Sequence, residues 1–447
     1  MGQRCGSPVV SRLASAGHHR GRPNSAAVGA AAPTRGWCSV AGVTVGESLS
    51  LVATCSRGLE EVLAAELVAL GGRDVQMGRG MVRFVGSVAL LLRANLELRT
   101  AIRIVLPLVA GAASNRDALY ALAAGVAWEE FVAPGQTIAV EVAGGAPAFR
   151  DRRFAALVVK DALVDRLRAR RGARPDVDRN QADVRIHLHL GAEETSIALD
   201  SSGEPLSHRG YRPRGGPAPL SEALAAGLLL LAGYHGDRPF CDPMCGTGTI
   251  AIEAALIATR TAPGLRRSFA MERWKWIDAG RTATLRRELQ ERRCRARCPV
   301  WAFDVDARAV RATLRNARAA GVADVVIVRR SAIRDLPLLP AGTLIVTNPP
   351  YGVRLGDAGE LAELYGELGQ TLKWAVKEGT AWVLAGGAAV LPAVRLRPAE
   401  RLVLFNGPLR CRFVRYDLRD GLGGGHGARR PGGKDDTARA GSHTGRE

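Results

Sequence analysis

The possible folds of this chain are limited most by a glycine-containing loop between an apolar strand and a helix. The loop has the sequence Asp242-Pro243-Met244-Cys245-Gly246-Thr247-Gly248-Thr249. Such turns are typical of open α/β sheets, in which ligands bind outside the carboxyl ends of the strands. The glycines at 246 and 248 let the backbone approach a ligand closely. A second motif, Asn348-Pro349-Pro350-Tyr351, ends a later apolar strand, so we expect both motifs to face one crevice.

From Leu220 onward, short apolar strands alternate with helical segments. We predict strands at Pro239–Cys241, Pro299–Phe303, Val325–Val328, Leu344–Thr347, Ala381–Leu384, Leu402–Phe405 and Arg412–Tyr416. This alternation predicts an α/β fold with a mainly parallel sheet and helices on both faces. The last two strands are close in sequence and predict an antiparallel hairpin at the edge of the sheet.

The preceding half of the chain predicts two smaller α+β units. In the first, residues 48–110, we expect strands Leu49–Cys55, Met81–Val85 and Ala101–Val109 and helices Gly58–Leu70 and Val88–Leu98. In the second, residues 111–205, we expect helices Arg116–Ala123 and Phe154–Arg170 and strands Thr137–Val142, Val184–Leu190 and Thr195–Leu199. The segment Ser202–Pro219, rich in Gly, Pro and Arg, predicts an interdomain connector. We place the linker at 206–219 and the α/β domain at 220–420.

The two ends of the chain lack sustained hydrophobic periodicity. Residues 1–47 are poor in acids and contain arginines, a composition compatible with an organelle transit peptide. No apolar core of a secretory signal follows, and we favour a disordered extension. Residues 421–447 are rich in Gly and Arg, which predicts a disordered tail.

The charge balance indicates a polyanionic partner. The chain has 62 Lys and Arg against 43 Asp and Glu, a net charge of +19, which favours nucleic acid. A GC-rich genome would explain the preference for Arg over Lys but not the excess over acids. For any one arginine, a solvated helix surface is the alternative to a phosphate contact. The arginines that cluster in and beside the second unit are our candidate RNA contacts: Arg150, Arg152, Arg153, Arg168, Arg170, Arg171, Arg209 and Arg212.

The remaining composition argues against metal and membrane sites. The eight cysteines include two C-x₃-C spacings, but neither has a matching Cys/His pair, so we predict no metal and reduced thiols. The apolar run Ala223–Ala232 is too short to span a bilayer, so no membrane partner is predicted. His187 and His189 alternate with apolar residues on a predicted strand, and we interpret them as surface positions.

The two motifs together resemble those of S-adenosylmethionine-dependent methyltransferases that modify exocyclic or side-chain nitrogens. In this interpretation, the glycine loop lies beside the methionine moiety of the cofactor and Asp242 meets its amino group. Asp304 ends the next strand, where it would accept hydrogen bonds from ribose hydroxyls, and the third strand ends beside the adenine. A tight turn is the alternative for a lone G-x-G. The predicted cofactor-binding residues are Asp242, Cys245, Gly246, Thr247, Gly248, Asp304, Asp306, Ser331 and Ala332.

The second motif suits methyl transfer to a planar nitrogen. An exocyclic base amine is a poor nucleophile because its lone pair is delocalised into the ring. If the Asn348 side-chain oxygen and the Pro349 carbonyl accept both N–H hydrogens, the nitrogen becomes more tetrahedral and reactive. Tyr351 can stack on an extruded base, which contributes about 1–3 kcal/mol. We predict Asn348, Pro349, Pro350 and Tyr351 as catalytic residues; a strand-ending turn with a packing tyrosine is the alternative.

Further segments make the resemblance more specific. They are Ala53-Thr54-Cys55-Ser56-Arg57-Gly58-Leu59-Glu60-Glu61, Asn95-Leu96-Glu97-Leu98-Arg99-Thr100-Ala101, Leu199-Asp200-Ser201-Ser202-Gly203, His208-Arg209-Gly210-Tyr211-Arg212, Ala262-Pro263-Gly264, Phe269-Ala270-Met271-Glu272-Arg273-Trp274 and Leu404-Phe405-Asn406-Gly407. From about Leu49 to Asp420 the chain resembles the THUMP-domain rRNA guanine-N2 methyltransferases of the bacterial RlmL/YpsC type.

This resemblance implies a ferredoxin-like unit, a THUMP RNA-binding domain and a Rossmann-like class I methyltransferase domain. It implies a cytoplasmic enzyme that methylates N2 of a guanine in 23S rRNA, with no obligate protein partner. Ser331 stands where many relatives have Asp, which weakens the expected adenine contact. Some relatives continue into a second methyltransferase domain, and this chain ends before one. The alternatives are a tRNA guanine-N2 methyltransferase, a DNA adenine-N6 methyltransferase and a catalytically silent RNA-binding assembly factor.

Overall fold

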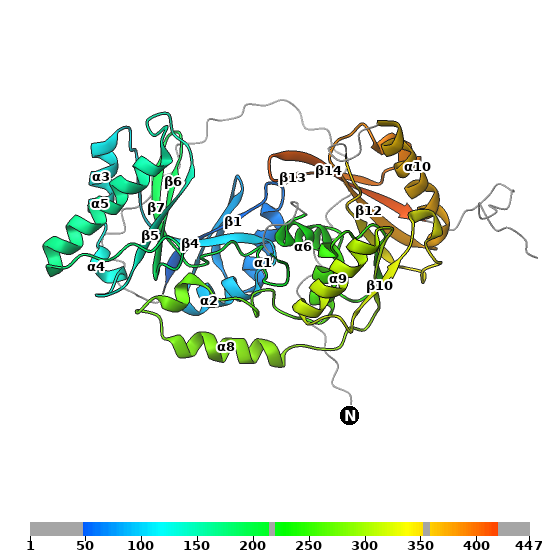
Figure 1. Ribbon diagram of the computed structural model, residues 1–447, viewed down its shortest axis with the longest axis horizontal. Coiled ribbons are helices and arrows are strands. Elements are labelled where there is room, and N and C mark those ends of the chain that lie inside the picture. Colours follow the sequence, from blue (N-terminus) through cyan, green and yellow to red (C-terminus); the bar gives the residue numbers. More distant parts are fainter. Residues whose placement is uncertain (1–47, 214–219, 352–357, 419–447) are drawn as a thin grey trace, which may run out of the picture.

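The computed structural model describes residues 48–213, 220–351 and 358–418. The predictions for 1–47, for 421–447 and for 214–219 in the connector lie outside the described residues. The described chain forms two β-sheets, which lie side by side with their helices (Figure 1). We call them the N-terminal sheet and the C-terminal sheet.

The N-terminal sheet has seven strands in the order β2-β3-β1-β4-β7-β6-β5. Its strands are β1 (Leu49–Cys55), β2 (Arg73–Gly78), β3 (Met81–Gly86), β4 (Ala101–Gly111), β5 (Ile138–Gly144), β6 (Val184–Leu190) and β7 (Thr195–Asp200). The accompanying helices are α1 (Glu60–Ala69), α2 (Val88–Glu97), α3 (Arg116–Ala124), α4 (Trp128–Phe131) and α5 (Arg152–Arg171). Because the long strand β4 pairs with β1 on one side and β7 on the other, the two predicted α+β units share one continuous sheet.

The two faces of the N-terminal sheet differ in chemistry. Alternate residues such as Leu51, Ile104 and Leu188 are buried in the core that the helices cover. The intervening residues, including Arg103 and Arg185, point to the opposite face. Strand β2 is absent from the sequence prediction because its residues are mostly exposed and polar and do not alternate.

The C-terminal sheet has the order β10-β9-β8-β11-β12-β14-β13. Its strands are β8 (Phe240–Asp242), β9 (Val300–Asp304), β10 (Val326–Arg330), β11 (Leu344–Thr347), β12 (Gly379–Ala385), β13 (Glu400–Asn406) and β14 (Leu409–Leu418). Its helices are α6 (Glu222–Leu231), α7 (Thr249–Ala258), α8 (Ala279–Glu291), α9 (Ala307–Ala320) and α10 (Ala358–Ala375), with 3-10 turns η1 (Ala270–Arg273), η2 (Ile333–Asp335) and η3 (Leu391–Val394). Strands β8 to β12 are parallel, and the antiparallel β14 lies between β12 and β13. The predicted α/β fold and terminal hairpin are therefore confirmed, with β13 at the edge.

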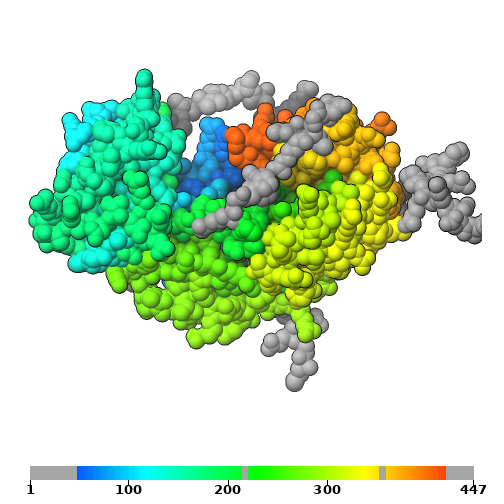
Figure 2. Space-filling model, viewed as in Figure 1, coloured from blue at the N-terminus to red at the C-terminus, as the bar shows by residue number. Residues whose placement is uncertain are grey.

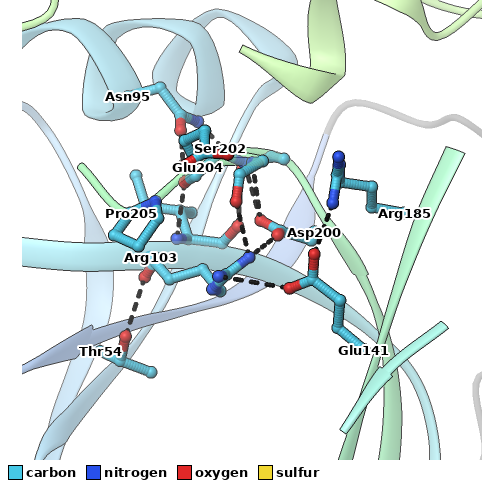
Figure 3. A network of polar contacts seen from close by, with 12 residues as sticks. Thr54, Asn95, Arg103, Glu141, Arg185, Asp200, Ser202, Glu204 and Pro205 are labelled. Atoms are coloured by element: carbon cyan, nitrogen blue, oxygen red, sulfur yellow. Dashed lines mark hydrogen bonds and ion pairs between the residues drawn. The ribbon is translucent and has the colours of Figure 1, made fainter. Parts of the chain in front are cut away.

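A buried polar network joins the two halves of the molecule (Figure 3). The Asn95 side chain, 1% exposed, donates to the Ser201 hydroxyl (2.9 Å) and accepts from the Ser202 hydroxyl (2.7 Å). Ser201 in turn accepts a hydrogen bond from the Met271 amide in η1, at 3.0 Å. Arg103 forms ion pairs with Asp200 and Glu141 beside this network. The segments around Asn95 and Ser201 therefore hold the N-terminal sheet against the C-terminal half.

The surface view shows a lobe formed by β5 to β7 and their helices, and a second lobe formed by the C-terminal sheet (Figure 2). Between them lies a hollow whose visible floor is the start of the N-terminal sheet. In the part of the chain that the structure describes, no helix is both long enough and apolar enough to cross a bilayer.

Candidate active site

The two sequence motifs meet at one edge of the C-terminal sheet. Strand β8 lies between β9 and β11, and all three run parallel, so their carboxyl ends share this edge. The Thr347 hydroxyl, at the end of β11, donates a hydrogen bond of 2.8 Å to Asp242 Oδ1, at the end of β8. The glycine loop and the Asn348 motif are thus directly linked, as the sequence predicts.

The glycine loop is held from behind by helix α9. The Thr313 hydroxyl donates to the Gly246 carbonyl and the Asn316 amide donates to the Thr247 carbonyl, each at 2.9 Å. Gly248 has a φ of 83°, and a Cβ there would lie 2.5 Å from the Thr313 methyl group. Gly248 therefore allows close packing against α9 and supports the loop, and its contact with the cofactor stays a prediction.

The opposite side of the loop is open. Gly246 has a φ of 55°, and a Cβ built on it meets no atom within 4 Å. The neighbouring Thr247 hydroxyl is buried and has no hydrogen-bond partner among the described residues. Helix α7 begins at Thr249, so its amino terminus faces the same space. An open approach, an unpaired hydroxyl and a helix amino terminus fit a ligand that carries a carboxylate, such as the methionine end of S-adenosylmethionine.

The two acids predicted at the strand ends have different environments. Asp242 is 1% exposed, and this burial raises the pKa of its carboxyl to about 7. Asp304 is half-buried; its Oδ2 accepts from the Gly246 amide at 2.8 Å and its Oδ1 accepts from the Asp306 amide at 2.9 Å. Asp304 therefore shapes the glycine loop and lies beside it, where a ribose contact is expected.

Two further predicted cofactor residues have structural roles. The exposed Asp306 carboxylate caps α9 by accepting from the Arg308 amide at 2.7 Å, which accounts for its position without a ligand. Cys245 is buried, and burial raises the pKa of its thiol, so it is a packing residue rather than a nucleophile.

Ser331 and Ala332 follow β10, and the Ser331 amide donates to the Asp304 carbonyl at 3.0 Å. Ser331 therefore lies next to Asp304, and the expected contact of Ser331 and Ala332 with the adenine stays a prediction.

The Asn348 motif presents an unsatisfied acceptor. Asn348 Oδ1 is buried and has no hydrogen-bond partner among the described residues. A buried carbonyl oxygen without a donor costs free energy, so it indicates a site that a ligand completes. Pro349 is buried beside it and Pro350 is exposed. The arrangement can accept an N–H group from a planar amine.

Tyr351 is positioned by residues that the sequence analysis does not assign to the site. The Asn406 amide, at the end of β13, donates to the Tyr351 hydroxyl at 3.0 Å. The ring lies against Gly386, where a Cβ would come within 2.3 Å of the ring. The segment Leu404–Gly407 carries the resemblance in sequence, but only the fold shows that its asparagine reaches Tyr351. We call the Asn406–Tyr351 hydrogen bond the tyrosine tether.

The N-terminal sheet contacts the strand that carries this tether. The Arg57 guanidinium lies 4.0 Å from the centre of the Phe405 ring, one residue before Asn406. Gly58 has a φ of 93°, and a Cβ there would lie 2.6 Å from the Val403 carbonyl oxygen. The loop between β1 and α1 therefore packs directly on β13.

The prediction that Arg209 and Arg212 contact RNA is wrong. Arg209 is 3% exposed and its Nε lies 3.5 Å from a carboxylate oxygen of the buried Glu253 on α7. Arg212 forms an ion pair of 2.6 Å with Glu222 and donates to Thr249 Oγ1 at 3.1 Å. Both guanidinium groups brace helix α7, because the described part of the connector is packed between the domains instead of crossing solvent.

The other predicted arginines remain on the surface. Arg150, Arg152, Arg153, Arg168, Arg170 and Arg171 are all exposed, at or near the two ends of α5. Arg171 also donates to the carbonyls of Val132 and Glu129, so part of its role is to hold α4. Their contact with RNA stays a prediction.

The interpretation of both histidines as surface positions is half correct. His189 is exposed, but His187 is half-buried and its Nδ1 has no partner among the described residues. Burial lowers the pKa of His187 to about 4, so it is neutral at physiological pH. Within the described ranges, no group of three or more His, Cys, Asp or Glu side chains could hold a metal ion.

Comparison with known proteins matches three stretches of the chain to family models. Residues 50–105 match the RlmL ferredoxin-like domain, residues 113–200 match the THUMP domain, and residues 209–415 match the RMKL-like methyltransferase domain. A putative RNA methyltransferase of Synechocystis is 34% identical over 82% of this chain and 96% of its own length. The chain belongs to the RMKL-like methyltransferase family. The predicted class I methyltransferase fold with a ferredoxin-like and a THUMP region is thereby confirmed.

Two other relatives bear on function. The ribosomal RNA large subunit methyltransferase K/L of Syntrophotalea carbinolica is 39% identical over 83% of this chain, and the chain spans 54% of that protein. The crystal structure of SMU.472, a putative methyltransferase complexed with SAH, has a TM-score of 0.77 and 29% sequence identity. That comparison covers 84% of this chain and 99% of the solved one.

Proposed function

We propose that this family member transfers a methyl group from S-adenosylmethionine to the exocyclic N2 of a guanine in RNA, with 23S ribosomal RNA as its substrate in the cytoplasm. The observation that carries the proposal is the buried, unpaired Asn348 Oδ1 at the sheet edge next to the glycine loop. The matched THUMP domain and the K/L-type relative support RNA as the substrate class. The SAH-bound relative supports the cofactor.

The residues at the sheet edge would hold the cofactor and orient the base. Gly246, Thr247 and the start of α7 fit its methionine moiety, and Asp304 fits a ribose. The bound cofactor supplies an electrophilic methyl group. Asn348 Oδ1 and the Pro349 carbonyl would accept the two amine hydrogens of guanine, so that the lone pair is directed at the methyl carbon. Tyr351, held by the tyrosine tether, would stack on the extruded base.

No side chain has to act as a nucleophile in this scheme. Burial raises the pKa of both Cys241 and Cys245, so neither is a thiolate at neutral pH. The transfer is therefore a direct displacement, in which positioning and electrostatics lower the barrier. The new N–C bond replaces the S–C bond of the donor, which leaves as a neutral thioether, and the methylated amine releases one proton to water.

The test is to incubate the protein with labelled S-adenosylmethionine and protein-free rRNA, total tRNA or DNA, and to identify the labelled nucleoside. We expect label in N2-methylguanosine of 23S rRNA. Label confined to tRNA would assign the tRNA alternative, and label in adenine of DNA would refute the guanine assignment. No label in any pool would support a non-catalytic RNA-binding factor.

The role of Asn348 is tested in the same assay. Because it contributes an acceptor to the reacting amine, Asn348→Ala is expected to lower kcat by about 10²–10³. Cofactor binding, measured by calorimetry, should remain close to that of the unmodified protein, because the glycine loop is unchanged. Asn180→Ala, at an exposed position in a distant loop, is the control and should retain full activity. Unchanged turnover in Asn348→Ala would contradict the assigned role.

A further inference from the structure

Helix α9 has two chemically distinct faces. Its inner face carries Thr313 and Asn316, which bind the glycine loop, together with the buried Ala317 and Ala320. Its outer face carries exposed arginines at a spacing of three or four residues. We call this set the α9 stripe; it consists of Arg308, Arg311, Arg315 and Arg318.

The α9 stripe has no polar partner among the described residues. In the part of the chain that the structure describes, no hydrogen bond or ion pair involves any of these four guanidinium groups. The helix itself contains no acid, and the Asp306 carboxylate at its start is engaged as the helix cap. Four uncompensated positive charges on one helix face repel one another, so the stripe is arranged for an external polyanion rather than for stability.

The far end of the helix adds to this charge. Arg293 donates to the Gly321 carbonyl at 3.1 Å, and the Arg266 guanidinium lies against Gly321 at the C-terminus of α9. These two side chains interact with the negative end of the helix dipole, as does Arg318 in the last turn, whereas Arg308, Arg311 and Arg315 lie too far from that end. In Figure 1, α9 lies on the outside of the C-terminal sheet. In Figure 2, the yellow-green atoms in the same place are on the visible surface of the molecule.

The stripe begins next to the candidate active site. Helix α9 follows β9, whose last residue Asp304 binds the glycine loop. Adjacent strands lie about 4.8 Å apart, so β9 is about 10 Å from β11 and its Asn348 motif. The stripe runs from Arg308 to Arg318, which is about 15 Å of helix and corresponds to several phosphate spacings along one strand.

We propose that the α9 stripe binds backbone phosphates of the RNA that enters the active site, as a second RNA contact separate from the THUMP region. The inference rests on the proposed function for the identity of the polyanion. A membrane surface is disfavoured, since membrane-surface helices expose large apolar side chains beside their basic residues and the outer face of α9 exposes none. The absence of exposed aromatic side chains on α9 also indicates phosphate contacts without base stacking.

The test is the salt dependence of RNA binding, measured without cofactor on 23S rRNA fragments. The variant R308Q/R311Q/R315Q/R318Q removes the charges and keeps good helix formers. Each phosphate contact contributes about 0.7–0.9 to the slope of log K against log salt, so we expect the slope to fall by about 3. The KM for RNA should rise about tenfold or more, with cofactor affinity and kcat at saturating RNA unchanged.

Two controls separate the stripe from bulk charge. The quadruple Arg→Lys variant keeps the charge and should retain most of the slope. A quadruple Gln variant at the exposed positions Arg73, Arg79, Arg281 and Arg287, which lie outside the THUMP match and outside α9, loses the same net charge and should change the slope much less. An unaltered slope and KM in the stripe variant, or an equal loss in the distant variant, would overturn the inference. If the unmodified protein binds RNA through the stripe but labels no guanine N2, the proposed function is refuted, while the inference that the stripe binds RNA phosphates is upheld.

Discussion

The tyrosine tether predicts a specific kinetic coupling between two residues of different strands. Asn406→Ala removes the amide that donates to the Tyr351 hydroxyl across 3.0 Å. A neutral, partly buried hydrogen bond contributes about 0.5–1.5 kcal/mol, and 1.36 kcal/mol is a tenfold change in rate. If the tether holds the ring where the base stacks, Asn406→Ala and Tyr351→Phe should each lower kcat about two- to thirteenfold.

A double-mutant cycle is the appropriate assay, because both substitutions remove the same bond. With RNA and S-adenosylmethionine saturating, the double variant should be no slower than the slower single variant. Asn406→Asp should recover much of the lost activity, since its carboxylate can accept a hydrogen bond from the Tyr351 hydroxyl. Cofactor affinity should be unchanged in all variants, because β13 does not contact the glycine loop directly.

Two results would refute this reasoning. If the losses of the two single variants multiply in the double variant, Asn406 acts through some group other than the Tyr351 hydroxyl. If Asn406→Ala lowers the melting temperature and cofactor affinity together, its role is to stabilise the hairpin of β13 and β14. In either case the position of Tyr351 would depend on contacts other than the Asn406 bond, among them its packing against Gly386.

Three further predictions concern the glycine loop and its supports. Gly248→Ala should lower the free energy of unfolding by about 1–3 kcal/mol in denaturant titrations, because its Cβ would clash with α9. Gly246→Ala should lower the free energy of unfolding less. It should weaken cofactor binding in calorimetry, since its Cβ projects into the open space beside the loop. Cofactor affinity should rise between pH 6 and 8, with release of a proton on binding. The reason is that the Asp242 carboxyl has a pKa of about 7 and must ionise to pair with the ammonium group of the cofactor. Asp242→Asn should abolish this pH dependence. Ionising this carboxyl also lowers fold stability as the pH rises towards 7, because the folded state holds the proton more tightly than the unfolded state. Arg209→Ala should destabilise the protein by about 3–5 kcal/mol, because the buried Glu253 loses its ion pair and keeps the hydrogen bond from the Tyr211 hydroxyl, while the salt slope of RNA binding stays constant.

The architecture could be predicted from the sequence where the local pattern reflects burial. Strands such as Leu344–Thr347 are buried throughout, and they appear in the sequence as short apolar runs between helices. Helix α7 is buried over its whole length, so it is uniformly apolar and its position follows from the glycine loop before it. Strand β2 has no such pattern, because it is an exposed edge strand held by its pairing with β3.

The site could be located but not fully assembled from sequence. Asp242, Gly246 and Asn348 follow strands, and the parallel order of those strands brings them together. β14 is antiparallel to both β12 and β13, so β13 runs in the same direction as β12 and its last residue, Asn406, lies at the same sheet edge as Tyr351. That contact depends on a tertiary arrangement in which the two residues are far apart in the chain, and no local pattern encodes it.

The arginines show most clearly what cannot be predicted from composition. Arg209 and Arg212 belong to a basic cluster in the sequence, yet both are used to brace α7. The arginines of the α9 stripe look like an ordinary amphipathic helix in sequence, and only the fold shows that they lack partners. Ion pairing is decided by acids that are distant in the chain, so charge runs alone cannot separate structural from RNA-binding arginines.

The contacts around Phe405 give the N-terminal half a direct connection to the active site. Arg57 lies on the Phe405 ring and Gly58 fits against the Val403 carbonyl, while the next residue of the strand, Asn406, holds Tyr351. A displacement of the loop between β1 and α1 would therefore change the position of the tethered tyrosine. This loop follows β1, which belongs to the same continuous sheet as the THUMP region. The sheet therefore connects the THUMP region to the residues that position Tyr351.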